Sequence, residues 1–90
     1  MISIPLRQLD PRYIKGKDGE PTGISFECPA CTKTQTHRVR VRWADAQRND
    51  EPLWERSGLT FDELTLSPSI DGTPSCKFHG FLRMGKVCYS

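Results

Sequence analysis

Two short segments of this chain carry residue types that could do chemistry, and both have the spacing of metal ligands. Cys28 and Cys31 form a Cys-x-x-Cys pair, and Cys76 and His79 form a Cys-x-x-His pair. Zinc binds thiolate and imidazole ligands in a tetrahedron, and four protein ligands leave no open position for water or substrate. The spacing therefore predicts one structural Zn2+ per chain, held by Cys28, Cys31, Cys76 and His79, although iron could occupy the same ligands.

Three other uses of these residues agree less well with the sequence. A Rieske cluster needs two histidines on one iron, and only one of the two pairs contains a histidine. A thioredoxin-like pair stands at the start of a helix, whereas the residues after Cys31 alternate like a strand. Two disulfides would suit a secreted domain, but residues 1–7 lack the basic start and long apolar run of an export signal. We therefore expect a reduced protein in the cytoplasm.

The chain is short, which makes a stabilising metal useful. It has 90 residues, 36% of them hydrophobic, and a domain of this size buries a small fraction of its surface. Structural zinc contributes roughly 10 to 16 kcal/mol of apparent binding free energy, so we expect metal binding and folding to be one event. No segment reaches the roughly 20 apolar residues of a membrane span, and the formal charge of +2 gives no general attraction to nucleic acid.

Alternation of apolar and polar residues predicts the strands that must position these ligands. Residues 23–27 alternate and run directly into Cys28. Residues 34–43 alternate for longer, and they place His37, Val39, Val41 and Trp43 on one side and Arg38, Arg40 and Arg42 on the other. Residues 81–89 contain two apolar runs around a glycine, which is typical of a closing hairpin.

The remaining segments are less regular. Residues 1–22 contain several prolines and glycines and no sustained period, which predicts a loop-rich N-terminal arm. Thr60 and Glu63 could form a capping box, so residues 60–66 stay open between a helical turn and a strand. Residues 67–75 are rich in turn formers. The pattern as a whole predicts a mostly β, small zinc-ribbon-like antiparallel domain over residues 23–90, preceded by the arm at residues 1–22.

The row of arginines on the predicted strand at residues 34–43 is the best cue for nucleic-acid binding. Alternate residues of a strand lie roughly 6 to 7 Å apart, which is close to the phosphate spacing along one nucleic-acid strand. Arg38, Arg40 and Arg42 could therefore contact a backbone, and the chain's tryptophans, Trp43 and Trp54, could stack on bases. We favour the simpler interpretation, in which the arginines pair with acidic residues of the chain and the tryptophans belong to the core.

Two further residues have open roles. His37 lies on the apolar side of its predicted strand, where it could support or replace a metal ligand, although a packed histidine is the commoner case. Cys88 could compete for metal or act as a nucleophile, and a cysteine in a buried hairpin more often behaves as a small hydrophobic residue.

Three motifs carry a resemblance to a known family. They are Trp-x-x-Ser-Gly at residues 54–58, Leu-Thr-Leu-x-Pro-Ser-Ile at residues 64–70, and Cys-x-x-His-Gly at residues 76–80 followed by an apolar hairpin. Over residues 24–89 the chain resembles a family of small zinc-binding proteins of tailed phages and prophages. The resemblance implies a viral or prophage origin and a zinc-binding fold, with the four metal ligands at the expected positions. Some relatives occur beside ubiquitin-like conjugation components, an association that we do not transfer.

These observations predict a phage- or prophage-encoded small protein with structural zinc, acting as a non-enzymatic binding module toward a host or phage protein in the cytoplasm. The predicted ligand set is closed, and no nucleophile, base or open metal position is evident beside it. The first alternative is nucleic-acid binding through Arg38, Arg40 and Arg42. The second is an enzyme with an open metal position, in which His79 or Cys88 is free for chemistry.

Overall fold

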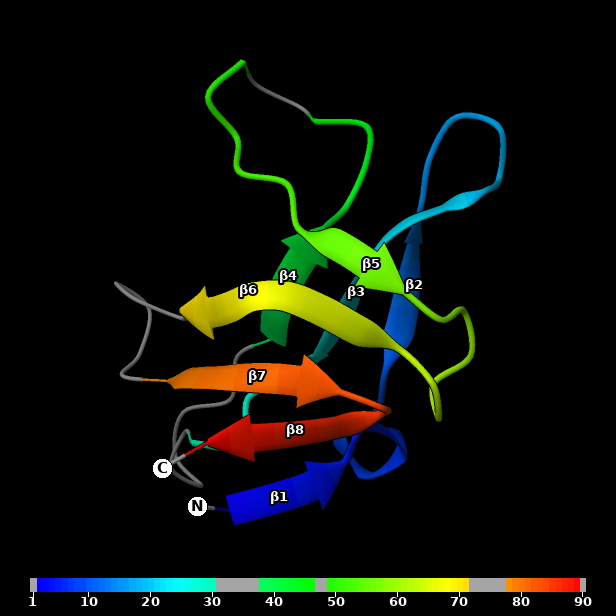
Figure 1. The fold of residues 1–90 in the computed structure, drawn as a ribbon. Helices are drawn as coiled ribbons and strands as arrows, with labels where there is room; N and C mark the ends of the chain where they lie inside the picture. The colour runs from blue at the N-terminus through cyan, green and yellow to red at the C-terminus, as the bar shows by residue number, and fades with distance from the viewer. Residues whose placement is uncertain (1, 31–37, 47–48, 72–77, 90) are drawn as a thin grey trace.

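A computed structural model describes residues 2–30, 38–46, 49–71 and 78–89 of the chain. The elements in these residues are β1 (Ile2–Pro5), the 3-10 helix η1 (Leu6–Leu9), β2 (Arg12–Lys15), β3 (Pro21–Glu27), β4 (Arg38–Arg42), β5 (Glu55–Ser57), β6 (Thr65–Asp71), β7 (His79–Arg83) and β8 (Lys86–Tyr89). They form a five-stranded sheet in the order β1-β8-β7-β6-β5 and a three-stranded sheet in the order β2-β3-β4. All pairings are antiparallel, and Figure 1 shows the three-stranded sheet crossing behind the five-stranded one. The prediction of a small antiparallel β domain is confirmed.

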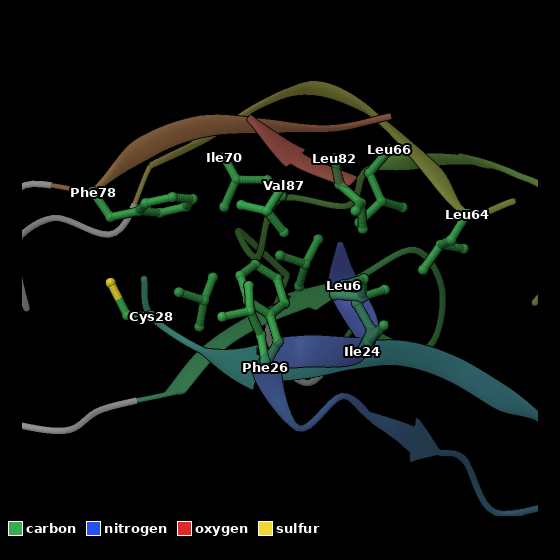
Figure 2. Close-up of a cluster of buried hydrophobic side chains, with 13 residues drawn as sticks. Leu6, Ile24, Phe26, Cys28, Leu64, Leu66, Ile70, Phe78, Leu82 and Val87 are labelled. Atoms are coloured by element: carbon green, nitrogen blue, oxygen red, sulfur yellow. The ribbon is translucent and has the colours of Figure 1, made fainter. Parts of the chain in front are cut away.

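The hydrophobic core lies between the two sheets (Figure 2). The three-stranded sheet contributes Ile24, Phe26, Val39 and Val41, and the five-stranded sheet contributes Leu66, Ile70, Leu82 and Val87. Phe26 meets Phe78 edge to face, with ring centroids 6.3 Å apart. β4 and β7 bury alternate residues, as burial on one face of a sheet requires, whereas β3 buries every residue from Thr22 to Phe26. The strand predicted at residues 23–27 is present as part of β3, although its buried residues are consecutive, and the alternation predicted from residue 38 onward is confirmed in β4.

Residues 2–15 enter both sheets. β1 pairs with β8 at one edge of the five-stranded sheet, and β2 pairs with β3 in the other sheet. Between them Leu6 is completely buried, and its backbone N–H donates to the carbonyl oxygen of Gly85 at 2.7 Å. Each of these strands has only four residues, which is too short for an alternating pattern to stand out among the prolines and glycines of this segment.

The segment before β6 combines the two structures that the sequence left open. The backbone N–H of Leu64 donates to the carbonyl oxygen of Thr60 at 2.9 Å, and the Thr60 hydroxyl lies 3.0 Å from a carboxylate oxygen of Glu63. This single turn ends where β6 begins at Thr65. The same turn is tied to η1, because Arg7 donates two hydrogen bonds to Asp62 at 2.7 and 3.1 Å. This bonding lowers the pKa of the Asp62 carboxyl and raises the pKa of Arg7.

β6 continues through residues that the sequence favours as turn. Ser67, Ser69 and Ile70 are strand residues, although Pro68 lies among them. The register between β6 and β7 shifts between Leu66 and Ile70, so β6 has extra residues here. A proline lacks the backbone N–H and is tolerated in a sheet at such irregularities, where no ladder bond is needed.

Ile24 provides a test of the core. It is completely buried on β3, whereas Ile2 on β1 is 50% exposed. Replacing Ile24 by valine removes one buried methylene, and we expect a loss of about 0.5–1.5 kcal/mol in the free energy of unfolding. The same change at Ile2 should cost less than about 0.5 kcal/mol. Urea denaturation of both variants measures the difference, and equal losses would contradict the placement of these two side chains.

Candidate functional site

The outer face of β6 and β7 brings together a serine and a histidine. Leu66 and Ile70 of β6 point into the core, and so does Leu82 of β7, since all three are at most 2% exposed. Alternation along each strand therefore turns Ser69 and His79 to the opposite face. His79 is exposed and Ser69 is half-buried, so both side chains are accessible from solvent.

The strand register places this serine and histidine next to each other. Asp71 is opposite His79 in the ladder, and Ile70 is opposite Gly80. Ser69 is two residues before Asp71, and a ladder that continues regularly from these two pairs makes it the diagonal neighbour of His79, although the register shift between Leu66 and Ile70 begins next to this residue. Diagonal neighbours have Cα atoms about 7–8 Å apart, with their Cβ atoms somewhat closer. Rotation of the two side chains can therefore bring the serine hydroxyl to the imidazole, the geometry in which a histidine activates a serine.

The backbone of Ser69 is held by a tryptophan. The indole Nε1–H of Trp54 donates to the carbonyl oxygen of Ser69 at 3.2 Å. Trp54 is itself joined to the other sheet, because its backbone N–H donates to the carbonyl oxygen of Arg42 at 2.9 Å. A shallow pocket next to this contact is lined by Trp43, Trp54, Glu55 and Arg56. Two successive hydrogen bonds through Trp54 therefore connect the Ser69 backbone to β4 of the three-stranded sheet.

Two of the four predicted zinc ligands fall within the described residues. Cys28 is 9% exposed and belongs to the core cluster next to Phe78 (Figure 2), whereas His79 lies on the outer face of β7. Cys31 and Cys76 lie outside the described residues, and so does His37. Among the residues that the structure describes, no three His, Cys, Asp or Glu side chains are grouped so that they could hold a metal. One Zn2+ per chain therefore stays a prediction.

Two of the three arginines of β4 are paired with acids. Arg38 lies 3.1 Å from a carboxylate oxygen of Asp10 and also donates to the Ser25 hydroxyl at 3.2 Å. Arg42 lies 3.5 Å from a carboxylate oxygen of Glu51. Arg38 and Arg42 therefore agree with the simpler interpretation, in which the arginines pair with acidic residues of the chain.

The remaining residues singled out in the sequence occupy separate places. Trp43 and Trp54 are half-buried and pack against the core. Cys88 is half-buried on the outer face of β8, opposite Phe81, with its sulfur 3.7 Å from the Ser3 hydroxyl. It is therefore on the same face as His79 rather than in the core.

Sequence reasoning missed Ser69. The serines at residues 67 and 69 stand among prolines and glycines, where serine is common simply as a turn former. A signal was present in the apolar residues Leu64, Leu66 and Ile70, which all have even numbers and fit one face of a strand. A strand with these apolar residues on its core face has Ser69 on the outer face. The pairing of β6 with β7, which the sequence does not show, then places Ser69 close to His79.

Comparison with known proteins adds a family. Residues 3–90 match the model of a family described as bacterial ubiquitination-like system serine protease (BubE). No curated protein and no solved structure matches the chain. In the described residues no helix is long and apolar enough to cross a membrane.

This match corrects the function that the sequence predicted. A phage-encoded, non-enzymatic zinc-binding module is wrong, because the matched family is one of serine proteases. The alternatives of a nucleic-acid-binding zinc ribbon and an enzyme with an open metal position disagree with it for the same reason. The spacing of the Cys and His residues led to the wrong function because it is a strong local pattern. The proximity of Ser69 to His79, in contrast, depends on strand pairing. Protein partners, which we expected, agree with a ubiquitination-like system. Since the match covers almost the whole chain, the protein belongs to the BubE family of serine proteases of bacterial ubiquitination-like systems.

Proposed function

We propose that this chain hydrolyses an amide bond in a protein of a bacterial ubiquitination-like system, with Ser69 as nucleophile and His79 as general base. The observation that carries the proposal is the pairing of Asp71 with His79 in the ladder between β6 and β7, which places His79 close to the accessible Ser69 two residues earlier on β6. His79 is the one histidine in the part of the chain that the structure describes. The cytoplasm, expected from the sequence, is the compartment that we propose for this reaction.

The proposed chemistry has two steps. The Ser69 hydroxyl oxygen attacks the carbonyl carbon of the substrate while His79 takes the hydroxyl proton. The same imidazole then gives this proton to the leaving amine as the carbon–nitrogen bond breaks. Water next attacks the acyl-enzyme with His79 again as base, which releases the carboxylic acid and restores the serine.

Other nucleophiles on the same face fit less well. Ser67 is also exposed, but it is two residues further from His79 along β6, or about 7 Å. Cys88 lies on the other side of β7 and is opposite Phe81, so it too is a diagonal neighbour of His79. The family is one of serine proteases, and this favours the hydroxyl of Ser69 over the thiol of Cys88.

Trp54 is expected to position the nucleophile. Replacing it by phenylalanine removes the hydrogen bond to the Ser69 carbonyl oxygen but keeps an aromatic ring in place. A hydrogen bond of this kind is worth about 0.5–1.5 kcal/mol, so kcat should fall by about two- to tenfold. Trp43 offers a matched control, because its indole donates to the carbonyl oxygen of Pro21 at the same 3.2 Å. Trp43→Phe should lose similar stability and keep kcat, and equal losses of kcat would contradict a positioning role.

The experiment for the proposal as a whole uses a protein substrate. The purified chain is incubated with the ubiquitin-like protein of the system, both free and joined to a target, and the products are read by intact mass spectrometry. Hydrolysis must give two fragments whose masses sum to that of the substrate plus one water. We expect cleavage with the wild-type chain and none with Ser69→Ala, and cleavage by both proteins would refute the assignment of Ser69.

A further inference from the structure

The hairpin of β7 and β8 carries two cations that face each other. Arg83 and Lys86 are direct partners in the ladder between these strands, and both are exposed. Like charges directly opposite each other destabilise a sheet. Neither residue has an ion pair within the described part of the chain, whereas Arg7, Arg12, Arg38 and Arg42 each lie within 3.5 Å of a carboxylate oxygen. The hairpin therefore has uncompensated positive charge at a defined place.

These cations are held in a rigid setting. The guanidinium carbon of Arg83 lies 4.6 Å from the centre of the half-buried Phe81 ring. Three hydrogen bonds fix the turn between the strands. Two involve the Gly85 backbone: its carbonyl oxygen accepts from Leu6 N–H at 2.7 Å, and its N–H donates to the Leu64 carbonyl oxygen at 3.0 Å. In the third, Met84 N–H donates to the Thr65 hydroxyl at 2.9 Å. Because the turn is already ordered, a ligand that binds here causes little loss of conformational entropy, and this favours binding.

The same strand connects the cations to the proposed active site. His79, Phe81 and Arg83 are alternate residues of β7 and therefore share its outer face. The distance along the strand from His79 to Arg83 is about 13 Å, or four residues at about 3.3 Å each. Met84, at the tip of the hairpin, is 65% exposed and adds apolar surface next to the charges. An extended peptide on this face would meet the imidazole, then an aromatic ring, then the cations.

We infer that the outer face of β7 and β8 recognises an acidic segment of the protein substrate, with Arg83 and Lys86 binding carboxylates about four residues from the bond that is cleaved. The two cations have no ion pair in the described residues and are complementary to carboxylates, and this supports an acidic ligand. The position of the cleaved bond relative to these cations rests on the proposed function. The residue that determines specificity is then an aspartate or glutamate of the substrate, and Phe81 and Met84 contact the apolar residues beside it.

The test is a titration of the 15N-labelled Ser69→Ala chain with two peptides, followed by NMR. The probes are Ac-Thr-Val-Thr-Val-Glu-Glu-Thr-NH2 and the same peptide with both Glu replaced by Gln. At about 0.5 kcal/mol for each of the two exposed charge pairs, the acidic peptide should bind about fivefold more tightly at low salt. We expect its shifts to cluster on β7 and β8, and 0.5 M NaCl should remove the difference between the peptides.

Two variants complete the test. In Arg83→Gln/Lys86→Gln the acidic and neutral peptides should bind equally, while Lys15→Gln/Lys17→Gln, which removes two cations elsewhere, should keep the fivefold difference. The inference is overturned if the two peptides bind equally to the Ser69→Ala chain that keeps Arg83 and Lys86, or if the shifts of the acidic peptide lie away from β7 and β8. Because this readout needs no catalysis, it is separate from the failure of the proposed function, which only the hydrolysis by wild-type and Ser69→Ala proteins reports.

Discussion

Replacing Ser69 by alanine should lower the rate of hydrolysis by more than about a thousandfold, because loss of a serine nucleophile removes the covalent step and leaves only binding and electrostatic effects. The fold should not change. The side chain lies on the outer face of β6, and it is the carbonyl oxygen of Ser69, not its hydroxyl, that accepts the bond from Trp54. Single-turnover kinetics measures the rate, and urea denaturation measures the stability.

Ser67 gives the matched control for this variant. It is on the same face of the same strand and is exposed, but it is two residues further from His79. Ser67→Ala should therefore keep the rate of hydrolysis within about threefold of the wild type. A large loss in Ser67→Ala together with an active Ser69→Ala would move the nucleophile from residue 69 to residue 67.

Replacing His79 by glutamine should also lower hydrolysis by more than about a thousandfold, because glutamine is polar and of similar size but cannot take the serine proton. His79 is exposed on β7, so the free energy of unfolding should change by less than about 0.5 kcal/mol. The kinetic assay is the one used for Ser69→Ala, and in His79→Ala, which leaves space for the ring, addition of free imidazole should restore part of the rate.

The metal content of this variant separates two roles that exclude each other. An imidazole nitrogen bound to zinc has no free lone pair, so the same histidine cannot be both a structural ligand and the base. Native mass spectrometry of protein purified without added metal should give the same metal content for the wild type and His79→Gln. If the wild type carries one zinc and the variant none, His79 is a ligand as the spacing predicted, and the proposed base is wrong.

The strands that the sequence predicted well are those with long alternation. β4 buries alternate residues, β3 carries Ile24 and Phe26 into the core, and the hairpin of β7 and β8 has its glycine, Gly85, in the left-handed region at φ 74°. β1 and β2 have four residues each, too few for a period to be distinguished. β6 was obscured because Pro68 and two serines interrupt its apolar residues.

The candidate site could not be predicted because it depends on strand pairing. Ser69 and His79 are ten positions apart in the numbering and lie on adjacent strands only because β6 pairs with β7, in a ladder whose register shifts between Leu66 and Ile70. A bulge of this kind has no reliable sequence signature. The Cys-x-x-His spacing at residues 76–79, in contrast, is visible in the sequence. It predicts that His79 is a metal ligand, and it gives no information about a neighbour of His79 on β6.

The measurement that tests the central claim most directly is labelling with a fluorophosphonate, a probe in which an activated serine oxygen displaces fluoride from phosphorus. The wild-type chain is treated with the probe, digested, and mapped by tandem mass spectrometry. We expect one adduct, on Ser69, and no adduct in His79→Gln, because the hydroxyl is then not activated. An adduct on another residue, or no adduct on a folded wild-type chain, would contradict the assignment of Ser69 and His79 as nucleophile and base.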